Sequence, residues 1–312
     1  MSFNILVTGG AGYLGSTLVP ELLNAGHNVT VLDNFMFRQA SLNHVCHLPN
    51  FQAINGDVRN ESVIKKAVQG KDIIIPLAAL VGAPLCSRDP EGASTTNYHS
   101  IAKMLKMLGK QQRVIYPTTN SGYGIGEKGI YCTEKTALRP ISQYGKDKVA
   151  AEKAILERDN GLTFRLATVF GMSPRMRIDL LVNDFTYRAV NDRFIVLFES
   201  HFKRNYIHVR DVARAFMHAI DNFEAMKNEP CNVGLSEANL SKLELCQEIE
   251  KHVPEFHFLE APIGEDLDKR DYIVSNEKIE ATGWKPKHSL GDGIKELVKG
   301  YAMIKNTLYT NV

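Results

Sequence analysis

Tyr144 and Lys148 stand four residues apart in the stretch SQYGKDKVAAEKAI, which has the pattern of a helix over about 142–159. Residues with this spacing lie on one face of a helix, so the phenol and the ammonium can meet at one point. A tyrosine with its ordinary pKa of about 10 is a poor base at neutral pH. A nearby ammonium favours the phenolate, which can remove a proton from an alcohol. The pair therefore predicts oxidation of a hydroxyl group, with an exposed pair on a helix surface as the alternative.

Hydroxyl groups gather at a second place, the segment TTNSGYG at residues 118–124. It follows the apolar run 114–116, so its side chains would lie at the end of a buried strand. The segment contains neither carboxylate nor histidine. Hydroxyl groups at the end of a buried strand are typical of the edge of an active site.

A glycine-rich turn, TGGAGYLG, follows the first apolar run and opens the first predicted helix. Gly9 permits the tight turn, Gly12 lets the backbone approach a pyrophosphate, and Gly15 lets helix and strand pack closely. Asp33 closes the second predicted strand. A carboxylate there accepts hydrogen bonds from adenosine ribose and repels a 2′-phosphate, which predicts NAD rather than NADP.

Two residues near this turn leave alternatives open. Asp57, after the third predicted strand, could bond the adenine amino group or cap the helix predicted over 60–70. Arg38 lies close in sequence to Asp33 and would suit the 2′-phosphate of NADP. An NADP-dependent reductase is therefore a further possibility.

Strands and helices alternate in the first half of the chain and would position these residues. Strand-like runs lie at 5–7, 29–32, 51–54, 73–75, 114–116 and 163–166, with helical patterns near 13–26, 60–70, 93–110 and 142–159. This order predicts an α/β fold with a Rossmann-type doubly wound parallel sheet.

The alternation ends near residue 170, and later helical patterns lie near 178–191, 208–224, 241–252 and 290–305. We expect an NAD-binding Rossmann domain over 1–170, with a return segment at about 204–235. Residues 171–203 and 236–312 would form a smaller, mixed α/β substrate lobe.

Composition narrows the classes of partner. The chain has 312 residues, 44% of them hydrophobic and 23% charged, with a net charge of +2. This balance disfavours a nucleic-acid partner, so a few placed arginines would recognise any phosphate. The five cysteines have no paired or metal-binding spacing, which predicts free thiols and no metal. The chain begins on a strand pattern and has no membrane-length apolar run, so we expect a cytoplasmic protein without a membrane partner.

Together these motifs resemble the extended short-chain dehydrogenase/reductases, the NAD-dependent nucleotide-sugar epimerases and dehydratases. The resemblance rests on TGGAGYLG, Asp33, LAAL (77–80), Thr119 four residues before Tyr123, and YGKDK. It continues through RNYIHVRDVARAF (204–216), CNVGLSEANLS (231–241), DKRDYIVSNEKIEATGWKP (268–286) and LGDGIKEL (290–297). It implies NAD as cofactor, a nucleotide-diphosphate sugar as substrate, and a homodimer or larger assembly paired through the helices near 93–110 and 142–159.

The resemblance also implies roles for single residues. Thr119, Tyr144 and Lys148 would be catalytic, and Lys148 would also hold the nicotinamide ribose. Cofactor contacts are expected from Gly9, Gly12, Tyr13, Leu14, Gly15, Asp33, Asn34, Asp57, Val58, Leu77, Ala78, Ala79, Asn97, Tyr144 and Lys148. Substrate contacts are expected from Val81, Gly82, Asn120, Ser121, Thr168, Arg175, Arg177, Asn183, Arg204 and Arg270.

The resemblance implies more specific roles for four of these arginines, and His208 lies near them in the motifs. Arg204 and Arg270 match arginines that bind the substrate diphosphate, a role suited to a bidentate donor. Arg175 and Arg177, in SPRMR, would contact substrate phosphates or lie at a subunit interface. His208 is expected to cap or pack near a helix start rather than to react.

Family members usually begin by oxidising C4 of the sugar. The 4,6-dehydratases carry Asp-Glu, or at least Glu, directly after the catalytic threonine, where this chain has Asn120 and Ser121. An amide and an unactivated hydroxyl cannot do that acid–base work. The Cys–His pair of 3,5-epimerase/reductases is not evident either, and Cys132 is expected to be structural. We therefore expect an enzyme that stops at the 4-ketone, or a 4-epimerase that reduces it again.

Further stretches resemble a subgroup from capsule and surface-polysaccharide sugar pathways: LAALVGAPLC (77–86), NSGYGIGEKG (120–129), FRLATVFGMSPRMRIDLLVND (164–184) and DKRDYIVSN (268–276). That subgroup includes dehydrogenases that oxidise C4 of GDP-D-glycero-α-D-manno-heptose. The resemblance implies a GDP-sugar 4-dehydrogenase. A 4-epimerase, a 4,6-dehydratase and a non-catalytic NAD-sensing protein on the same fold are the alternatives.

Overall fold

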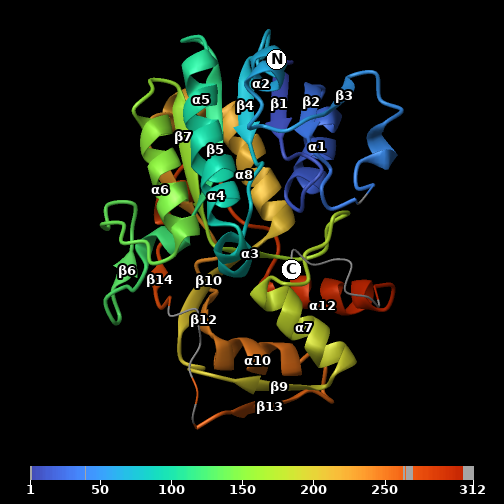
Figure 1. Ribbon diagram of the computed structural model, residues 1–312. Coiled ribbons are helices and arrows are strands. Elements are labelled where there is room, and N and C mark those ends of the chain that lie inside the picture. The colour runs from blue at the N-terminus through green and yellow to red at the C-terminus, as the bar shows by residue number, and fades with distance from the viewer. Residues whose placement is uncertain (1, 39, 263, 265–269, 305–312) are drawn as a thin grey trace.

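Seven parallel strands form the central sheet of the protein, whose computed structural model describes residues 2–38, 40–262, 264 and 270–304 (Figure 1). The order across the sheet is β11-β7-β5-β4-β1-β2-β3. The strands are β1 (Asn4–Thr8), β2 (Asn28–Asp33), β3 (Phe51–Asn55), β4 (Ile73–Pro76), β5 (Arg113–Thr119), β7 (Gly161–Leu166) and β11 (Pro230–Val233). The predicted doubly wound α/β fold is confirmed.

Helices cover both faces of this sheet. One face carries α1 (Gly15–Asn24) and α8 (Val209–Asp221), and the other carries α2 (Glu61–Ala67), α5 (Ser100–Met107) and α6 (Gln143–Leu156). Alternate residues of β1 divide between the two layers, since Ile5 and Val7 pack with α1 and α8 whereas Leu6 packs with the other three helices. Burial on both faces explains why the central strands β1 and β4 are nearly unbroken apolar runs.

The strand order creates one crevice at the carboxyl edge of the sheet. From β1 the chain winds through β2 and β3 in one direction, and through β4, β5 and β7 in the other. Ligands of open α/β sheets bind at the point where the direction reverses. The turn 9–14, the loop 77–82 and the turn 120–123 follow β1, β4 and β5, so they meet at this edge.

A smaller lobe lies beyond that edge (Figure 1). Its strands are β8 (Thr168–Phe170), β10 (Lys203–His208) and β12 (Asn239–Ser241) in one sheet, and the pairs β9 (Phe194–Leu197) with β13 (His257–Glu260) and β6 (Tyr131–Cys132) with β14 (Ile273–Val274). Its longer helices are α7 (Leu181–Asn191), α10 (Lys242–Glu250) and α12 (Leu290–Tyr301). Shorter elements that bear on the site are α3 (Ala83–Arg88), α4 (Pro90–Ser94), the π-helical turn η2 (Thr95–His99) and the 3-10 turn η3 (Asn120–Tyr123).

The segment 204–235 contributes elements to both lobes. Its first strand, β10, pairs with β8 and β12 in the smaller lobe. The helix α8 packs on the large sheet, and β11 joins that sheet as an edge strand beside β7. The chain therefore enters the small lobe, returns to the large sheet and leaves it again.

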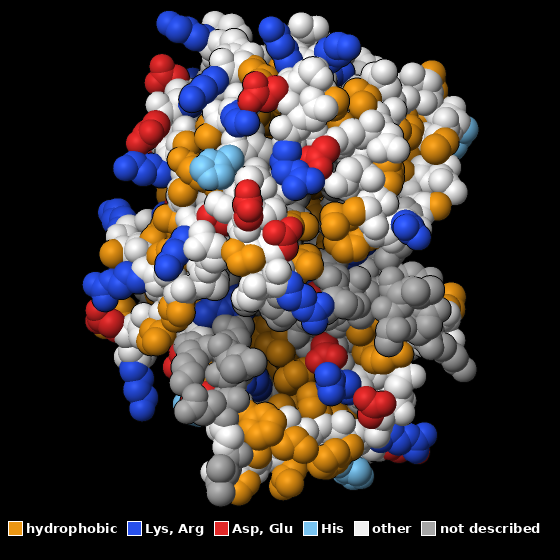
Figure 2. Space-filling model, in the orientation of Figure 1, with side chains coloured by type: hydrophobic (Ala, Val, Ile, Leu, Met, Phe, Trp, Pro, Cys, Tyr) orange, Lys and Arg blue, Asp and Glu red, His pale blue; other side chains and the backbone are white. Residues whose placement is uncertain are grey.

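Surface character differs between the lobes. Hydrophobic side chains gather on the small lobe over β9 and β13, where Phe194, Val196, Phe198 and Leu259 are 40–58% exposed (Figure 2). On the large lobe, basic and acidic side chains are interspersed in the same view. None of the helices in the described part of the chain combines the length and the apolar character needed to cross a membrane.

Candidate active site

The turn after β1 has the backbone geometry that a dinucleotide phosphate requires. Gly9 adopts a left-handed conformation with a φ of +69°, and a Cβ there would lie 2.5 Å from the backbone nitrogen of Ala78. A Cβ at Gly15 would lie 2.5 Å from the Cα of Gly10. Among the described residues, no side chain caps α1 at Leu14 and none in its first turn is acidic. The N–H groups at the start of α1 are therefore suited to an anion.

Asp33 closes β2 beside this turn. Its Oδ2 accepts a hydrogen bond from the backbone nitrogen of Ala11 at 3.0 Å, and its Oδ1 accepts one from Phe35 at 2.8 Å. Burial raises the pKa of Asp33, whereas these N–H groups and Arg175 act in the opposite direction. The next residue, Asn34, is exposed. Asp33 is thus fixed where a carboxylate can accept hydrogen bonds from a ribose.

Arg175 lies at the same edge, beside the turn after β1. Its guanidinium carbon is 3.9 Å from the centre of the Phe37 ring, and its backbone nitrogen donates to Ser16 Oγ at 3.2 Å. The side chain is buried. Phe37 follows Asp33 closely and Ser16 belongs to α1, so Arg175 faces the adenosine end of the cofactor site. A contact of Arg175 with the substrate phosphates, or a place at a subunit interface, stays a prediction.

Asp57 does not cap α2, so that alternative is wrong. The cap is Asn60, whose Oδ1 accepts from two backbone N–H groups of the first turn. Asp57 forms an ion pair with Arg59 at 2.6 Å, and this hydrogen-bonded guanidinium lowers the pKa of Asp57. Val58 packs against the core under α2. A contact between Asp57 and the adenine stays a prediction.

The loop after β4 is held by a buried amide. Asn97, on η2, accepts a hydrogen bond from Leu80 N at 2.8 Å and donates one to Leu80 O at 2.9 Å. The thiol of Cys86 donates to the same carbonyl at 3.3 Å. Asn97 therefore positions the loop. The predicted contact residues of this loop are half-buried at the crevice: Leu77, Ala78, Ala79, Val81 and Gly82.

Tyr144 and Lys148 lie on α6, which begins where the hydroxyl of Ser142 caps the helix. Lys148 is 4% exposed, and its Nζ donates a hydrogen bond to Pro117 O on β5 at 2.9 Å. The same Nζ lies 4.3 Å from the centre of the Tyr116 ring. The pair therefore faces the strand that leads to Thr119, and the exposed alternative is wrong.

The acidity of Tyr144 differs from the expectation. Burial raises its pKa to about 12, while Arg177 and Arg270 act to lower it. Burial also lowers the pKa of Lys148 to about 7. Burial therefore disfavours the charged form of each group, and the cations that lower the pKa of Tyr144 are Arg177 and Arg270. Cys86 influences both groups electrostatically, a neighbour that the sequence did not indicate.

Thr119 stands at the junction of β5 and η3. Its Oγ1 accepts a hydrogen bond from Ser121 N at 3.1 Å and donates to Ser121 Oγ at 3.0 Å. Arg270 also donates to Ser121 Oγ. Beneath this turn, the buried hydroxyl of Tyr123 donates to Asn232 Oδ1 at 2.7 Å. The hydroxyl-rich turn is thus held in place by the hydrogen bond of Tyr123 and joined to the small lobe through Arg270.

Asn120 is the anomaly of this turn. The residue is 1% exposed, and among the described residues neither its Oδ1 nor its Nδ2 has a hydrogen-bond partner. Leaving a buried polar group unpaired costs about 1–3 kcal/mol. Such a group beside Thr119 is suited to bind a substrate atom.

The other two predicted substrate arginines occupy different surroundings. Arg177 pairs with Asp179 and lies near enough to Tyr144 to lower its pKa. Arg204 is buried, donates to the carbonyl of Lys203 at 3.0 Å, and has its guanidinium carbon 5.7 Å from the centre of the Tyr272 ring. Arg177 thus acts on the phenol of Tyr144 through its charge, while a diphosphate contact of Arg204 stays a prediction.

Asn183 and Tyr13 join the cofactor turn to the small lobe. Tyr13 Oη donates to Gly171 O at 2.6 Å, and Asn183 Oδ1 accepts from Gly171 N at 3.0 Å. Asn183 Nδ2 donates to Arg177 O at 2.8 Å and to Tyr13 Oη at 3.3 Å. The Asn183 amide is wholly buried, so these bonds account for it without a ligand. Thr168 is half-buried on β8 and its substrate contact stays a prediction.

Two further expectations concern His208 and the thiols. His208 caps α8, accepting a hydrogen bond from Arg210 N at 3.2 Å, as predicted. All five cysteines are free thiols, and Cys132 packs with Tyr123 and Tyr272 in a small core. Within the described ranges, no three His, Cys, Asp or Glu side chains are grouped to hold a metal ion.

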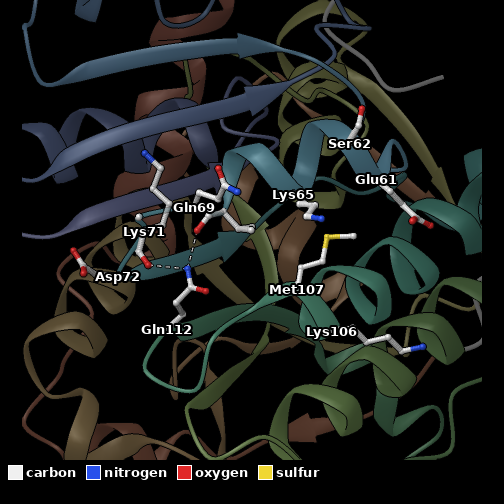
Figure 3. Close-up of a pocket in the computed structure, with 11 residues that line it drawn as sticks. Glu61, Ser62, Lys65, Gln69, Lys71, Asp72, Lys106, Met107 and Gln112 are labelled. Atoms are coloured by element: carbon white, nitrogen blue, oxygen red, sulfur yellow. Dashed lines mark hydrogen bonds between the residues drawn. The ribbon is translucent and has the colours of Figure 1, made fainter.

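A surface hollow lies away from this site. It has a volume of about 740 Å³ and is lined from α2 and α5, with Lys65, Lys106 and Gln112 among its residues (Figure 3). Asp72 and Gln112, in its wall, directly precede β4 and β5. The hollow is therefore at the amino edge of the sheet, opposite the crevice where α/β ligands bind.

Comparisons with known proteins agree with this geometry. Residues 5–234 match the model of the NAD dependent epimerase/dehydratase family. A low-salt glycan biosynthesis protein, Agl12 of Haloferax volcanii, is 28% identical over 96% of this chain and 98% of its own. A CDP-paratose 2-epimerase of Salmonella typhi is 27% identical over 94% and 97%.

A solved structure has the same architecture. The UDP-glucose 4-epimerase of Thermotoga maritima, crystallised with UDP-glucose, superposes with a TM-score of 0.82. It is 26% identical, and the superposition covers 96% of this chain and 99% of that one.

Proposed function

Because this chain belongs to the NAD dependent epimerase/dehydratase family, we propose that it oxidises the C4 hydroxyl of a nucleotide sugar to the 4-ketone. Thr119, Tyr144 and Lys148 carry the oxidation. The main support is their arrangement on β5 and α6, with no carboxylate at the two positions after Thr119.

Each residue of the site has its own role in the oxidation. Tyr144 Oη removes the proton of the C4 hydroxyl, and Thr119 Oγ1 holds the same sugar oxygen by a hydrogen bond. Lys148 stabilises the phenolate by its charge. Arg177 and Arg270 also lower the pKa of Tyr144. Their guanidinium groups therefore support the base as well as any anionic group of the substrate.

The cofactor is held by the chain's own turn and carboxylate. The residues fit a dinucleotide because Gly9 and Gly15 leave no room for a side chain, and because the N–H of Ala11 fixes the Asp33 carboxylate beside the turn. Lys148 would hold the nicotinamide ribose. NAD, when bound, supplies the hydride acceptor, and its positive ring favours the phenolate.

The same turn disfavours dehydration. Elimination of water from C5 and C6 needs a base for the C5 proton and an acid for the C6 hydroxyl. Asn120 and Ser121 stand where those groups would act, and neither can transfer a proton at neutral pH. We infer that the product is the 4-keto sugar nucleotide. A 4-epimerase, which would reduce the ketone on its other face, is the second candidate, and the similarity to the Thermotoga maritima epimerase favours it.

The substrate that we propose is GDP-linked, with GDP-D-glycero-α-D-manno-heptose as the first compound to test, in surface-polysaccharide precursor synthesis. Its support is the resemblance of residues 77–86, 120–129, 164–184 and 268–276 to that subgroup. Residues 265–269 lie outside the part of the chain that the structure describes. We further propose a cytoplasmic homodimer paired through α5 and α6.

The decisive experiment incubates the protein with UDP-, GDP-, CDP- and dTDP-sugars, including the GDP-heptose. NADH absorbance follows oxidation, and NMR identifies the sugar. A 4-keto product with NADH formed supports the dehydrogenase, and a sugar inverted at C4 without net NADH supports the epimerase. A 4-keto-6-deoxy product would overturn the role assigned to Asn120 and Ser121. Tyr144→Phe is the control for background oxidation.

A further inference from the structure

The hydroxyl of Thr119 is bonded to that of Ser121, its neighbour in the turn after β5. Thr119 Oγ1 donates to Ser121 Oγ at 3.0 Å and accepts from the backbone nitrogen of Ser121 at 3.1 Å. Thr119 is half-buried, whereas Ser121 is 3% exposed. Thr119 is therefore the more accessible of the two residues, but its only hydroxyl proton is bonded to Ser121.

Arg270 approaches the same hydroxyl from the small lobe. Its Nη1 donates a hydrogen bond to Ser121 Oγ. The residue that follows Arg270 is held from two sides, since Asp271 O accepts from Gly126 N at 2.8 Å and Asp271 Oδ1 accepts from Lys203 N at 2.8 Å. The backbone that carries Arg270 is thus fixed beside this turn, and a guanidinium is bonded to the oxygen of Ser121.

Ser121 also lies against the helix that carries the base. A Cβ at Gly145 would lie 3.6 Å from the carbonyl oxygen of Ser121. Gly145 directly follows Tyr144 on α6. The hydrogen bonds of Ser121 are therefore formed beside the residues assigned to the oxidation.

The hydrogen-bonding groups of Ser121 are unequally used. A hydroxyl group has two lone pairs and one proton. Both lone pairs of Ser121 Oγ receive donors, one from Thr119 and one from Arg270. In the described part of the chain no group accepts the Ser121 proton, so this proton is available for one more bond.

We propose that Ser121 is a positioning residue that turns the Thr119 hydroxyl toward the substrate. As the C4 oxygen of the sugar approaches, the Thr119 proton rotates to that oxygen and the Ser121 proton rotates to Thr119 Oγ1. The bond between the two hydroxyls is reversed but kept, the bond from Arg270 is kept, and a bond to the sugar is gained. No O–H bond is broken in this step.

The reversed bonds form a chain from a cation to the reacting oxygen. Arg270 donates to Ser121, Ser121 donates to Thr119, and Thr119 donates to the C4 oxygen, so each bond polarises the next. Negative charge develops on the C4 oxygen as its proton is removed. A chain that begins at a guanidinium stabilises this charge more than an isolated hydroxyl does. Since the gain is made in the transition state, Ser121 acts on kcat rather than on KM.

This inference rests on the proposed oxidation, and a double-mutant cycle tests it. The proteins are the wild type, Ser121→Ala, Thr119→Val and the variant with both substitutions. The rate constant of NADH formation in a single turnover is measured with the nucleotide sugar that the substrate panel identifies. A 4-dehydrogenase and a 4-epimerase both begin by oxidising C4, so NADH is formed in either case.

Two further variants complete the set. Ser121→Thr keeps the hydroxyl group and tests whether this group is the one that acts. Ser100→Ala is the matched control, because the Ser100 hydroxyl belongs to a residue that is 4% exposed and donates to Thr96 O at 2.6 Å.

Ser121→Ala is expected to lower the rate constant of oxidation about tenfold, the difference between a charge-assisted and a neutral hydrogen bond. KM should stay within about twofold of the wild-type value. In the Thr119→Val background the same substitution should have no further effect, because Ser121 acts through Thr119. Ser121→Thr should restore most of the rate, and Ser100→Ala should change neither quantity.

Ser121→Ala with the wild-type rate would overturn the proposal, and so would losses that simply add in the double variant. A wild type that oxidises no nucleotide sugar at C4 would instead overturn the proposed function, and this inference with it. If Thr119→Val does not fold, the comparison of Ser121→Ala with Ser121→Thr decides, and equal rates for these two variants would count against the proposal.

Discussion

Arg270 donates a hydrogen bond to the hydroxyl of Ser121, although 149 residues separate them along the chain. Ser121 is also bonded to Thr119, so the small lobe contacts the oxidation site through one hydroxyl. Arg270 in addition lowers the pKa of Tyr144. The lobe that would hold the substrate diphosphate therefore also affects the base.

Arg270→Gln is expected to move the pH dependence of turnover. Without this cation the pKa of Tyr144 rises, so the acid limb of the kcat/KM profile shifts to higher pH and activity recovers in alkaline buffer. The comparison variant is Arg204→Gln, because Arg204 is not among the groups that influence Tyr144. Arg204→Gln should raise KM without moving the limb. Identical profiles for wild type and Arg270→Gln would contradict this role.

Tyr144→Phe is expected to reduce kcat by about 10²–10⁴-fold, the usual contribution of a general base. The affinity for NADH should stay within about threefold of the wild-type value. The oxygen of Tyr144 accepts the substrate proton in the transition state, so its loss affects that state more than it affects cofactor binding. Stopped-flow absorbance and calorimetry measure the two quantities. Tyr131→Phe, at an exposed tyrosine, is the control. Near-full turnover by Tyr144→Phe would remove Tyr144 as the base.

Asn120→Leu is expected to raise the stability of the folded protein and to lower its catalytic activity. Replacing an unpaired buried amide by an apolar group of similar size should raise the free energy of unfolding by about 1 kcal/mol. kcat/KM should fall at least about tenfold, because the amide is then unable to bind the sugar. Asn232→Leu is the matched control: that amide is equally buried but bonded to Tyr123 and Ser275, so its loss should destabilise. A lower free energy of unfolding for Asn120→Leu would contradict the conclusion that the buried Asn120 amide lacks a hydrogen-bond partner among the described residues.

Lys148→Met is expected to change how stability depends on pH. Burial lowers the pKa of Lys148 from 10.5 to about 7. Between these values the unfolded chain binds a proton that the folded protein does not. The contribution of Lys148 to the free energy of unfolding of the wild type therefore rises with pH, by up to about 1.4 kcal/mol per pH unit.

The stability advantage of Lys148→Met over the wild type should thus be largest at pH 7 and below, and shrink toward pH 10. Urea unfolding at four pH values measures it. Lys146→Met, at an exposed position on the same helix, should give a difference that is independent of pH. A pH-independent difference for Lys148→Met would show that the ammonium is well solvated.

Glu152→Gln is expected to destabilise the protein by about 3–5 kcal/mol, since it leaves a buried guanidinium without its charge partner. Glu152 pairs with Arg165 at 2.7 Å, with side chains 4% and 7% exposed. Glu157→Gln removes a solvent-exposed pair with Lys153 on the same helix and should have little effect. Denaturant unfolding measures both. Equal effects would mean that burial does not decide the strength of these pairs.

The parts of the site that follow from local spacing could be predicted. Gly9, Gly15 and Asp33 belong to one strand–turn–helix–strand unit, whose geometry depends on residues next to one another in sequence. Tyr144 and Lys148 share a helix face for the same reason. The doubly wound sheet follows from the alternation of apolar runs and helices.

Other features depend on how distant segments approach each other. The carbonyl of Pro117 as a partner of Lys148, the position of Arg175 over Phe37 and the nearness of Cys86 to Tyr144 are set by tertiary packing. The direction of the Tyr144 pKa shift was wrong because spacing along a helix gives the neighbour but not the depth of burial, and desolvation is the largest influence. The cap of α2 is Asn60, three residues beyond Asp57, because the sequence places a helix start only to within a few residues.

The edge strand β11 has a consequence for how the chain is made. The large sheet begins with residues 4–8 and is completed only when residues 230–233 pair with β7, after the chain has passed through β8, α7, β9 and β10. A nascent chain ending near residue 170 would present β7 as an unpaired edge without α8 over its face, a state prone to aggregation. We therefore expect residues 1–170 expressed alone to aggregate, because the edge of β7 and the face that α8 covers in the whole chain would be exposed.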